Sequence, residues 1–385
     1  MKEFWLSKES CTGCGACSNI CPKNAIELIQ DSTGFRYPAI SSSCIDCNLC
    51  ENVCDRRVGN ATSRKPSVYA AWSKDDEVRF SSTSGGAFTE LANYIISHDG
   101  VVYGAAFDPD NVIRHIGATS NRELIELKRS KYAQSDIGLV FREIRNQLLE
   151  HRKVLFCGTP CQAAGLKAFL GRDYENLYIF DFICRGVNSP KAFRAWLDEL
   201  EHKKGSRVTK VWFKYKSGGW RKSPRCTRVD YDNEEIDIFD QEANSYMVGY
   251  LGPNLYIRPS CGKCEFKGTS RCSDITLADF WGLPTALDDD KGTSLVMVNS
   301  EKGRFLFEKA RDRLIAYDKP FEEVTKGNVC FGASVSINRR SAQFFEDLDR
   351  MSFSEALIKN SDSSFLGKIR KRALGFFRNS LELKE

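Results

Sequence analysis

The stretch CTGCGACSNICP at residues 11–22 is followed by CIDCNLCENVC at residues 44–54, and these two segments decide the N-terminal part of the fold. Each carries four cysteines in the spacing CxxCxxCxxxC, and 22 residues separate Cys21 from Cys44. Three cysteines separated by two residues can bind one iron–sulfur cubane, and the fourth, after a three-residue step, reaches the neighbouring cubane. The repeated pattern therefore predicts two 4Fe-4S clusters in one small domain.

In the crossed arrangement, one cluster is bound by Cys11, Cys14, Cys17 and Cys54, and the other by Cys44, Cys47, Cys50 and Cys21. Such crossing joins both halves into a two-cluster ferredoxin domain, expected over residues 1–60. Zinc sites and a disulfide scaffold are the alternatives. Zinc normally takes two CxxC pairs or Cys/His sets, and a disulfide scaffold would not repeat an identical four-cysteine pattern, so the clusters are favoured.

Length and composition indicate a larger second domain and a reducing compartment. The chain has 385 residues, more than one typical domain, and 16 cysteines that would scramble under oxidising conditions. It shows no charged-then-apolar leader and no apolar run near about 18 residues, which favours a cytoplasmic protein without a membrane span. The formal net charge of +5 is too small to indicate a nucleic-acid partner.

Residues 351–385 are expected to form a basic C-terminal helical tail. Its basic and apolar side chains alternate at amphipathic spacing, through Lys368, Ile369, Arg370, Lys371, Arg372, Leu374, Phe376, Phe377 and Arg378. One interpretation is a helix packed on the protein's own surface. The other is docking to a partner or peripheral contact with a membrane surface.

The segment from residue 67 to 350 is expected to be one larger α/β domain, after a polar linker at residues 59–66. Hydrophobic patterning predicts strands at residues 67–72, 101–107, 153–157 and 177–183, and helices at residues 87–97, 137–150 and from 189 onward. Because strands and helices alternate, this domain favours an α/β core, and the chain as a whole is of the α+β / α/β class. Ligands are then expected at loops that leave the carboxyl ends of strands.

Two loops of this domain have the chemistry of a cofactor site. The loop SSTSGG at residues 81–86 precedes a helix, so its backbone amides and hydroxyls suit a phosphate or pyrophosphate, although an ordinary Ser-Gly turn with a helix cap fits the same residues. The loop RSKYAQS at residues 129–135 places a cation, an aromatic ring and an amide together. It would suit a flavin ring, and a solvated helix start is the alternative.

Four cysteines outside the ferredoxin lie in loops flanked by Gly or Pro: Cys161, Cys184, Cys261 and Cys264. Four thiols from three loops would bind a third cubane, and a structural zinc would fit the same set. Cys272 is close enough in sequence to be a reserve ligand. Cys157 and Cys330 are expected as buried small hydrophobic residues, and Cys226 is left without a role.

Five motifs in order carry a resemblance to a known family. They are SGGAF at residues 84–88, SKYAQS at 130–135, FCGTPCQ at 156–162, CRGVNSP at 184–190, and CGKC at 261–264 with SDITLADFWG at 273–282. Together they make residues 67–300 similar to the coenzyme F420 hydrogenase/dehydrogenase beta-subunit family. The resemblance implies one FAD and one 4Fe-4S cluster in this domain, with electrons moving between a deazaflavin or another two-electron partner and iron–sulfur centres.

Carried over from that family, the flavin-site positions are Ser84, Gly85, Gly86, Lys131, Tyr132, Gln134, Ser135, Thr159 and Pro160. The resemblance places the cluster at Cys161, Cys184, Cys261 and Cys264. The chain departs from the family's usual pattern at Arg185, where a His is common, and at Arg129, where a Gly is frequent. The two-electron substrate is therefore not carried over.

The expected function is an FAD- and iron–sulfur-dependent oxidoreductase, because a flavin can exchange two electrons with a small molecule and single electrons with clusters. Its partners would be a small-molecule donor or acceptor and a redox partner protein or ferredoxin. The four histidines lie outside the motifs, so no catalytic acid or base is assigned. The alternatives are a ferredoxin-fed reductase in surface-polysaccharide metabolism and a non-enzymatic electron-transfer subunit of a larger complex.

Overall fold

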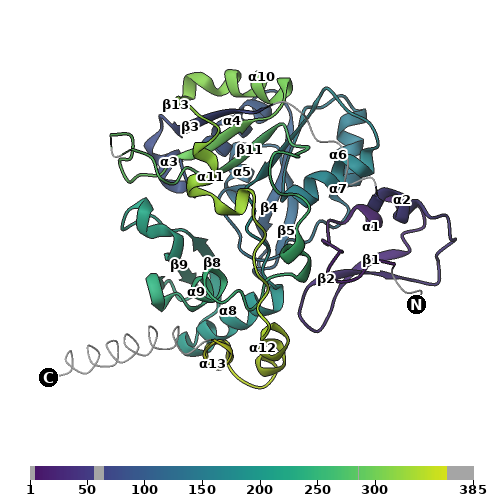
Figure 1. The fold of residues 1–385 in the computed structure, drawn as a ribbon, viewed down its shortest axis with the longest axis vertical. Coiled ribbons are helices and arrows are strands. Elements are labelled where there is room, and N and C mark those ends of the chain that lie inside the picture. The colour runs from purple at the N-terminus through teal and green to yellow at the C-terminus, as the bar shows by residue number, and fades with distance from the viewer. Residues whose placement is uncertain (1–4, 56–64, 285, 362–385) are drawn as a thin grey trace.

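The computed structural model describes residues 5–55, 65–284 and 286–361. They form three regions, each built on a separate sheet of two, eight or three strands (Figure 1).

The helices are α1 Ala16–Ile20, α2 Leu49–Asp55, α3 Asp76–Ser81, α4 Ala87–Ile96, α5 Asn121–Leu127, α6 Val140–Leu149, α7 Pro160–Leu170, α8 Pro190–Lys204, α9 Ser245–Leu251, α10 Glu301–Ala310, α11 Glu323–Gly327, α12 Ser341–Leu348 and α13 Phe353–Asn360. The strands are β1 Ile26–Gln30, β2 Arg36–Ile40, β3 Ser67–Ser73, β4 Val101–Phe107, β5 Ile113–Ala118, β6 Val154–Cys157, β7 Leu177–Phe182, β8 Val208–Phe213, β9 Thr227–Tyr231, β10 Ile236–Phe239, β11 Ile275–Asp279, β12 Ser294–Val298 and β13 Leu314–Lys319. Short 3-10 helices are η1 Trp220–Arg225, η2 Gln241–Ala243, η3 Pro259–Lys263, η4 Arg311–Arg313 and η5 Val329–Phe331.

The N-terminal region is a small iron–sulfur type domain at one side of the molecule (Figure 1). Its strands β1 and β2 form an antiparallel hairpin in which Ile26 pairs with Ile40. Helices α1 and α2 are formed by parts of the two cysteine segments, and the small core joins Cys17, Cys21 and Ala25 to the two isoleucines. The expected small N-terminal ferredoxin-type domain is confirmed here.

The large region is built on an eight-stranded mixed sheet in the order β13-β3-β12-β11-β7-β6-β4-β5. Four neighbouring strands, β11, β7, β6 and β4, run parallel to one another, and the outer strands pair antiparallel. The expected α/β core is confirmed. The antiparallel strands β3, β12 and β13 on one side of it were not predicted to join the same sheet.

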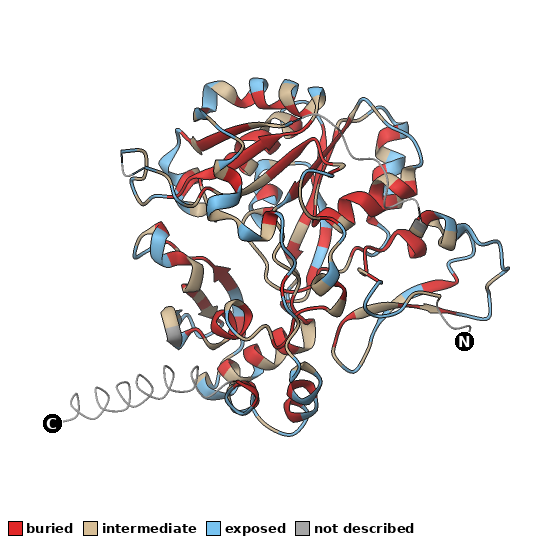
Figure 2. Cartoon of the chain, viewed as in Figure 1, coloured by how far each residue is buried: buried red, intermediate tan, exposed pale blue. Residues whose placement is uncertain are grey.

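Helices cover both faces of this sheet because alternate residues of its strands point to opposite sides. Val102 and Leu155 pack in the cluster that contains α4, α5 and α10, whereas Tyr103 and Phe156 pack in the cluster that contains α6 and α7. Burial is concentrated along the central strands (Figure 2). The ferredoxin region lies on the α6 and α7 side, where Cys14 joins their core.

The third region is the three-stranded antiparallel sheet β10-β9-β8 with α8, α9, α12 and α13 around it. Its core is aromatic, and Trp196, Tyr246 and Tyr256 are almost fully buried. The Trp196 and Tyr246 rings stack with centroids 5.2 Å apart, and so do those of Tyr246 and Tyr256 at 5.4 Å. Residues from this region reach the central cavity described below.

Two expected elements differ in extent from those observed. The helix expected at residues 137–150 begins at Val140, because Gly138 has a positive φ of 54° that a helix does not continue through. The tail expected at residues 351–385 includes α13, which packs Phe353 and Leu357 into the third region's core. The basic amphipathic segment at residues 367–378 lies outside the described residues. The domain boundaries at residues 60, 67 and 350 stay predictions.

No helix in the described ranges is both long and apolar enough to cross a membrane.

A buried ion pair stands at the carboxyl end of β7. Arg271 Nη1 lies 3.0 Å from Asp181 Oδ2, and the side chains are 2% and 1% exposed. Thr276 also donates its hydroxyl to Asp181. Burial raises the pKa of Asp181 even though Arg271 acts to lower it. Removing one partner of such a pair leaves an uncompensated charge, which is costly inside a protein.

Arg271→Met should therefore lower the free energy of unfolding by about 3–5 kcal/mol at pH 7. Because Asp181 has a raised folded-state pKa, lowering the pH neutralises its carboxyl in the folded variant, so the loss should shrink toward pH 5. Urea unfolding followed by near-UV circular dichroism at both pH values measures this. The double variant Asp181→Asn/Arg271→Met removes both charges and should recover most of the loss. An equal deficit in single and double variants would contradict the ion-pair account.

Candidate functional site

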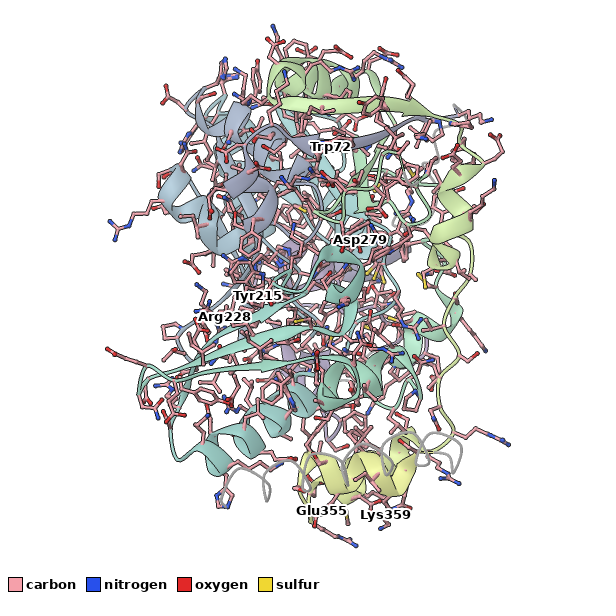
Figure 3. The ribbon with its side chains drawn as sticks, turned by 90° about the vertical axis from the view of Figure 1, so that its left-hand side faces the viewer. Trp72, Tyr215, Arg228, Asp279, Glu355 and Lys359 are labelled. Carbon is pink, nitrogen blue, oxygen red and sulfur yellow. The ribbon has the colours of Figure 1, made fainter. Side chains whose placement is uncertain are left out.

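A cavity of about 590 Å³ lies at the carboxyl ends of the parallel strands. Its wall includes the segments that follow β6, β7 and β11, namely Cys157–Thr159, Phe182–Val187 and Asp279 with Trp281. Asp279 lies near mid-height in Figure 3, below Trp72 and above Tyr215 and Arg228 of the three-stranded region. The expectation of a site at this edge of the sheet agrees with the position of the cavity, whose volume is in the range of small-molecule and cofactor sites.

The Ser-Gly loop borders the cavity and leads into helix α4. Gly86 takes the N-cap position with a left-handed φ of 89°, and no side chain caps the helix. The Ser84 hydroxyl instead donates to the Thr293 carbonyl at 2.6 Å. A Cβ at Gly85 would lie 2.4 Å from the Ala71 carbonyl, so only glycine fits there. The first-turn amides of α4 are thus left without a side-chain cap, as the phosphate interpretation of this loop requires.

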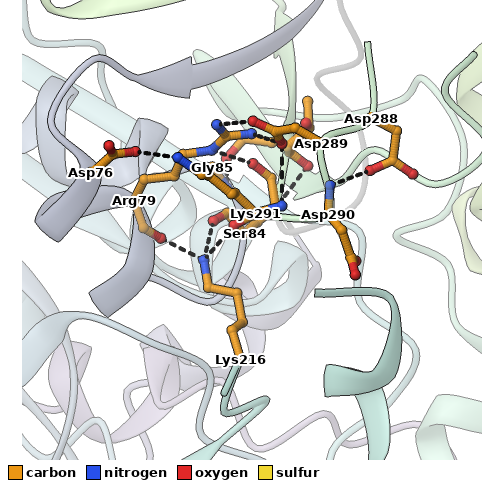
Figure 4. A network of polar contacts seen from close by, with 12 residues as sticks. Asp76, Arg79, Ser84, Gly85, Lys216, Asp288, Asp289, Asp290 and Lys291 are labelled. Atoms are coloured by element: carbon orange, nitrogen blue, oxygen red, sulfur yellow. Dashed lines mark hydrogen bonds and ion pairs between the residues drawn. The ribbon is translucent and has the colours of Figure 1, made fainter. Parts of the chain in front are cut away.

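A polar network holds the Ser-Gly loop from behind (Figure 4). Lys216 is 5% exposed and donates to the backbone carbonyls of Arg79, Ser84 and Lys291. Arg79 in turn pairs with both carboxylate oxygens of Asp289 at 2.7 Å. Burial, together with the charge of Arg79, lowers the pKa of Lys216 to about 7. The network fixes the loop and places the buried amino group of Lys216 beside it.

The loop at residues 129–135 forms the neighbouring part of the wall. Lys131 lines the cavity, and its Nζ donates to the carbonyls of Glu126 and Lys128, each at 2.7 Å. Burial lowers the pKa of Lys131 to about 7, with a further contribution from the charge of Arg129. The loop is joined to the Ser-Gly loop by the Ser130 amide, which donates to the Thr83 hydroxyl at 2.9 Å. The two predicted loops therefore meet at one cavity.

A second, smaller cavity is lined by the four cysteines predicted to form the third cluster site: Cys161, Cys184, Cys261 and Cys264. Cys161 lies in the first turn of α7, where Thr159 and Gln162 form a capping box. Cys184 follows β7, and Cys261 lies in η3. The pKa of Cys161 is raised to about 12 by burial, with contributions from the thiols of Cys14, Cys261 and Cys264.

The two cavities share a wall. Ser135, Thr159, Gln162 and the segment 184–187 line both. Gln162 Nε2 donates to the Ser135 hydroxyl at 3.0 Å, which ties the loop at residues 129–135 to helix α7. On its far side the cysteine-lined cavity reaches Thr12 and Gly13 of the ferredoxin region. The cysteine-lined cavity therefore adjoins both the large cavity and the ferredoxin region.

The ferredoxin cysteines separate into the two predicted sets. Cys21, Cys44, Cys47 and Cys50 line one cavity together. In the other set, burial raises the pKa of Cys17, and the thiols of Cys14, Cys11 and Cys54 raise it further. Within residues 5–55, 65–284 and 286–361, no group of three or more Cys, His, Asp or Glu residues is arranged to hold a single metal ion.

Most predicted flavin positions reach the large cavity, and three do not. Its lining includes Ser84, Gly86, Lys131, Tyr132, Ser135 and Thr159. Gln134 and Pro160 line the cysteine cavity instead, and Gly85 packs against β3 and β12. Cys157 and Cys330 were expected to be buried, but both are of intermediate exposure and line the large cavity. Cys272 packs with the α6 and α7 core and is absent from the lining of either cavity.

Several cavity residues were not predicted from the sequence. His115 of β5 is 6% exposed, and its Nε2 lies 3.2 Å from the Cys157 carbonyl, an arrangement that puts the proton on Nε2. Its Nδ1 has no partner among the described residues. Burial lowers the pKa of His115 to about 4, so the ring is neutral and Nδ1 is an acceptor. His115 lies two residues after the buried Ile113, so both point to the same face of the strand. This alternation is the sequence pattern that could have identified His115 as buried.

A buried ion pair of Lys214 and Asp279 also lines the large cavity. Burial opposes the charge of Lys214, but Asp279 more than offsets it, so the pKa of Lys214 is raised. Its Nζ lies 5.3 Å from the Trp281 ring centroid, and that ring stacks on Trp220 at 4.2 Å. The three-stranded region therefore contributes a cation to the cavity, which no local pattern around residue 214 indicated.

Family models described as the N-terminal and C-terminal parts of the coenzyme F420 hydrogenase/dehydrogenase beta subunit match residues 68–141 and 151–323, and a 4Fe-4S dicluster domain model matches residues 10–58. No curated protein matches the sequence. Among solved structures, a chain of the F420-reducing NiFe hydrogenase complex from Methanosarcina barkeri, in a xenon-derivatized form, is 19% identical with a TM-score of 0.47, covering 79% of this chain and 93% of that chain.

The two family matches are consecutive and together span more than half of the chain, and they include most of the residues that line both cavities. The dicluster match covers the eight-cysteine segment. The family predicted from the five motifs is thereby confirmed. This chain belongs to the coenzyme F420 hydrogenase/dehydrogenase beta-subunit family and is an iron–sulfur redox protein with an N-terminal 4Fe-4S dicluster domain.

Proposed function

We propose that the protein is an FAD- and iron–sulfur-dependent oxidoreductase that passes electrons between a two-electron small molecule and one-electron iron–sulfur carriers. The observation that carries this proposal is the shared wall between the two cavities. A cofactor in the large cavity and a cluster in the cysteine-lined cavity would be separated only by residues such as Ser135, Thr159 and Gln162. The cluster site also borders Thr12 and Gly13 of the ferredoxin region.

The residues of the large cavity fit a dinucleotide flavin. The uncapped first turn of α4 suits a pyrophosphate, and Lys216 holds the preceding Ser-Gly loop in place from behind. Lys131 and the neutral ring of His115 would face the more polar parts of the cofactor. When bound, a flavin supplies the exchange between two-electron and one-electron chemistry. The chain's own side chains bind and orient it and set the local charge.

The cysteine sets fit three 4Fe-4S clusters. Each set combines four thiols from neighbouring segments, which is the ligand number that such a cluster needs. In the third set, Cys184 lies on the wall shared with the large cavity, and the ferredoxin cysteine Cys14 acts electrostatically on Cys161. Electrons would therefore enter or leave through Cys184 on one side and Cys161 on the other.

The proposal is tested by a reductant screen on the pure, anaerobic protein. Reduced deazaflavin, NADH or NADPH is added, and absorbance is followed at flavin and cluster wavelengths. Rapid flavin bleaching followed by cluster reduction identifies the donor and establishes an enzyme with its own substrate. Reduction of the protein by a reduced ferredoxin alone, with no response to any two-electron donor, would instead support the electron-transfer subunit.

Anaerobically purified protein should contain about twelve irons and one flavin per chain. Three cubanes supply the irons, one from each cysteine set, and the large cavity supplies the flavin site. Iron and zinc are measured by mass spectrometry, and flavin by absorbance after release from the protein. A content of about eight irons with one zinc would assign the third site to a structural zinc.

Cys261→Ser and Cys184→Ser should each remove the third cluster's paramagnetic signal and leave the two ferredoxin signals. The ferredoxin cysteines lie in separate sets, so each keeps its own ligands. Electron paramagnetic resonance of the reduced protein measures all three. Cys272→Ser is the matched control, since Cys272 packs with α6 and α7, outside the cysteine cavity. Loss of the signal in that control would show that the assigned ligand set is wrong.

Lys131→Ala should lower the flavin's reduction potential, because a nearby cation stabilises the anionic reduced ring. A 30 mV change corresponds to about 1.4 kcal/mol for a two-electron couple. The pKa of Lys131 is lowered to about 7, so the side chain is charged below that pH and largely neutral above it. The difference from wild type should therefore be larger at pH 6 than at pH 8.5.

Spectroelectrochemical titration of the flavin measures this effect. Lys302→Ala is the matched control, because Lys302 also donates to two carbonyls, those of Tyr174 and Leu177, but lies outside the cavity lining. An unchanged potential at both pH values in Lys131→Ala, with flavin fully bound, would return the 129–135 loop to the simpler interpretation of a solvated turn.

A further inference from the structure

A buried arginine lies between the ferredoxin and the cysteine-lined cavity. Arg258 is 0% exposed. Arg258 directly precedes η3, the turn that carries Cys261. Its backbone carbonyl accepts a hydrogen bond from the Cys261 amide at 3.0 Å. Its side chain extends the other way, into the ferredoxin region. One residue therefore touches the segments that carry both cysteine sets.

The guanidinium contacts the ferredoxin at several atoms. Nε donates to the Cys11 carbonyl at 3.0 Å, and Nη2 donates to the Arg36 carbonyl at 3.1 Å and lies 3.8 Å from Cys11 Sγ. Nη1 donates to Gln134 Oε1 at 3.2 Å. The guanidinium carbon lies 4.2 Å from the Tyr37 ring centroid. The arginine thus reaches a predicted cluster ligand, Cys11, through both its carbonyl and its sulfur.

None of these acceptors is a carboxylate. Among the described residues, the partners of Arg258 are carbonyl and amide oxygens, a thiol sulfur and two aromatic rings. The buried Arg271, by contrast, has Asp181 at 3.0 Å. A fully buried charge without a counter-charge is strongly unfavourable, and buried charges are therefore paired or neutralised. An arginine is not neutralised by losing its proton, so its counter-charge must be an anion at this site.

We infer that Arg258 supplies a positive charge shared by two anionic 4Fe-4S clusters, the ferredoxin cluster bound through Cys11 and the third cluster bound through Cys261. This inference rests on the proposed function for the third cluster, and on the dicluster domain for the other. Four thiolates make each cluster anionic, and each reduction adds one negative charge. A buried cation beside both clusters stabilises their reduced states, and the net charge and hydrogen bonds around a cluster set its reduction potential.

The shared charge also explains why the two regions meet closely here. A Cβ at Gly13 would lie 2.5 Å from Gln134 Nε2 and 3.1 Å from the Arg258 guanidinium. The ferredoxin backbone therefore packs directly on the pair of Arg258 and Gln134. Two anionic clusters on either side of this contact would repel each other, and a cation between them offsets that repulsion. Arg258 thus makes successive reduction of both clusters easier.

The test compares Arg258→Met and Arg258→Lys with wild type in the full-length, anaerobic protein. Potentials are measured by dithionite titration with mediators, followed by paramagnetic resonance. Arg258→Met should decrease the equilibrium constant for reduction of both adjacent clusters about tenfold or more, which is 59 mV for a one-electron couple. Arg258→Lys keeps the charge and should stay within about threefold of wild type, since the effect is electrostatic.

Two controls separate charge from packing. Within the same molecule, the cluster held by Cys21, Cys44, Cys47 and Cys50 should change far less than its neighbour. Arg142→Met is the matched variant, because Arg142 also crosses from the large region to ferredoxin carbonyls, those of Ser18, Asn19 and Cys21, without a contact to a thiol. It should leave the Cys11 and Cys261 clusters unchanged.

The inference is overturned if Arg258→Met retains its clusters with unchanged potentials, if Arg142→Met shifts them equally, or if Arg258→Lys shifts them about tenfold. Should Arg258→Met fail to assemble clusters, the lysine variant decides alone, since a near wild-type potential is expected from it. Failure of the proposed function is distinguishable from failure of this inference. If the wild-type protein contains only two clusters, the proposed third cluster is rejected. The potential of the Cys11 cluster still shows whether Arg258 influences it.

Discussion

The packing of helix α1 on helix α7 is the contact on which the arrangement of the redox sites depends. A Cβ at Gly165 in α7 would lie 2.9 Å from Cys14 Sγ, so only glycine lets the ferredoxin come this close. Helix α7 also carries Cys161 in its first turn. One helix therefore contacts a ferredoxin cysteine with its middle and presents a thiol to the second cysteine set with its start.

Sheet topology supplies the remaining geometry. Strands β6 and β7 are adjacent and parallel, so the segments that carry Cys161, in the first turn of α7, and Cys184 leave the same edge of the sheet. The segment after Cys184 pairs with the segment before Cys261 through the Asn188–Ile257 bridge. Three segments that carry cysteines are thereby held at one place by backbone hydrogen bonds. The polar residues around them, including Arg258, then set the charge.

Much of the core was predictable from local patterns, because strand β4 coincides with the apolar run at residues 101–107 and helix α8 begins at its Ser189 cap and Pro190. The antiparallel neighbours of the core were not predictable in the same way. Strands β3, β12 and β13 pair across more than two hundred residues, and periodicity within a short window carries no information on such pairing. The late start of helix α6 depends on the left-handed backbone at Gly138.

The sequence by itself determined the chemistry of the sites: the cysteine number and spacing, the order of the motifs, and hence the family. Those features are local, since a cluster ligand pattern depends on residue type and interval. Tertiary structure alone decided which cavity each side chain faces. Gln134, placed in a flavin motif, contacts Arg258 and the ferredoxin instead, and His115 and Lys214 reach the large cavity from segments without a motif. Orientation of this kind follows from packing between elements distant in sequence, which residue spacing does not encode.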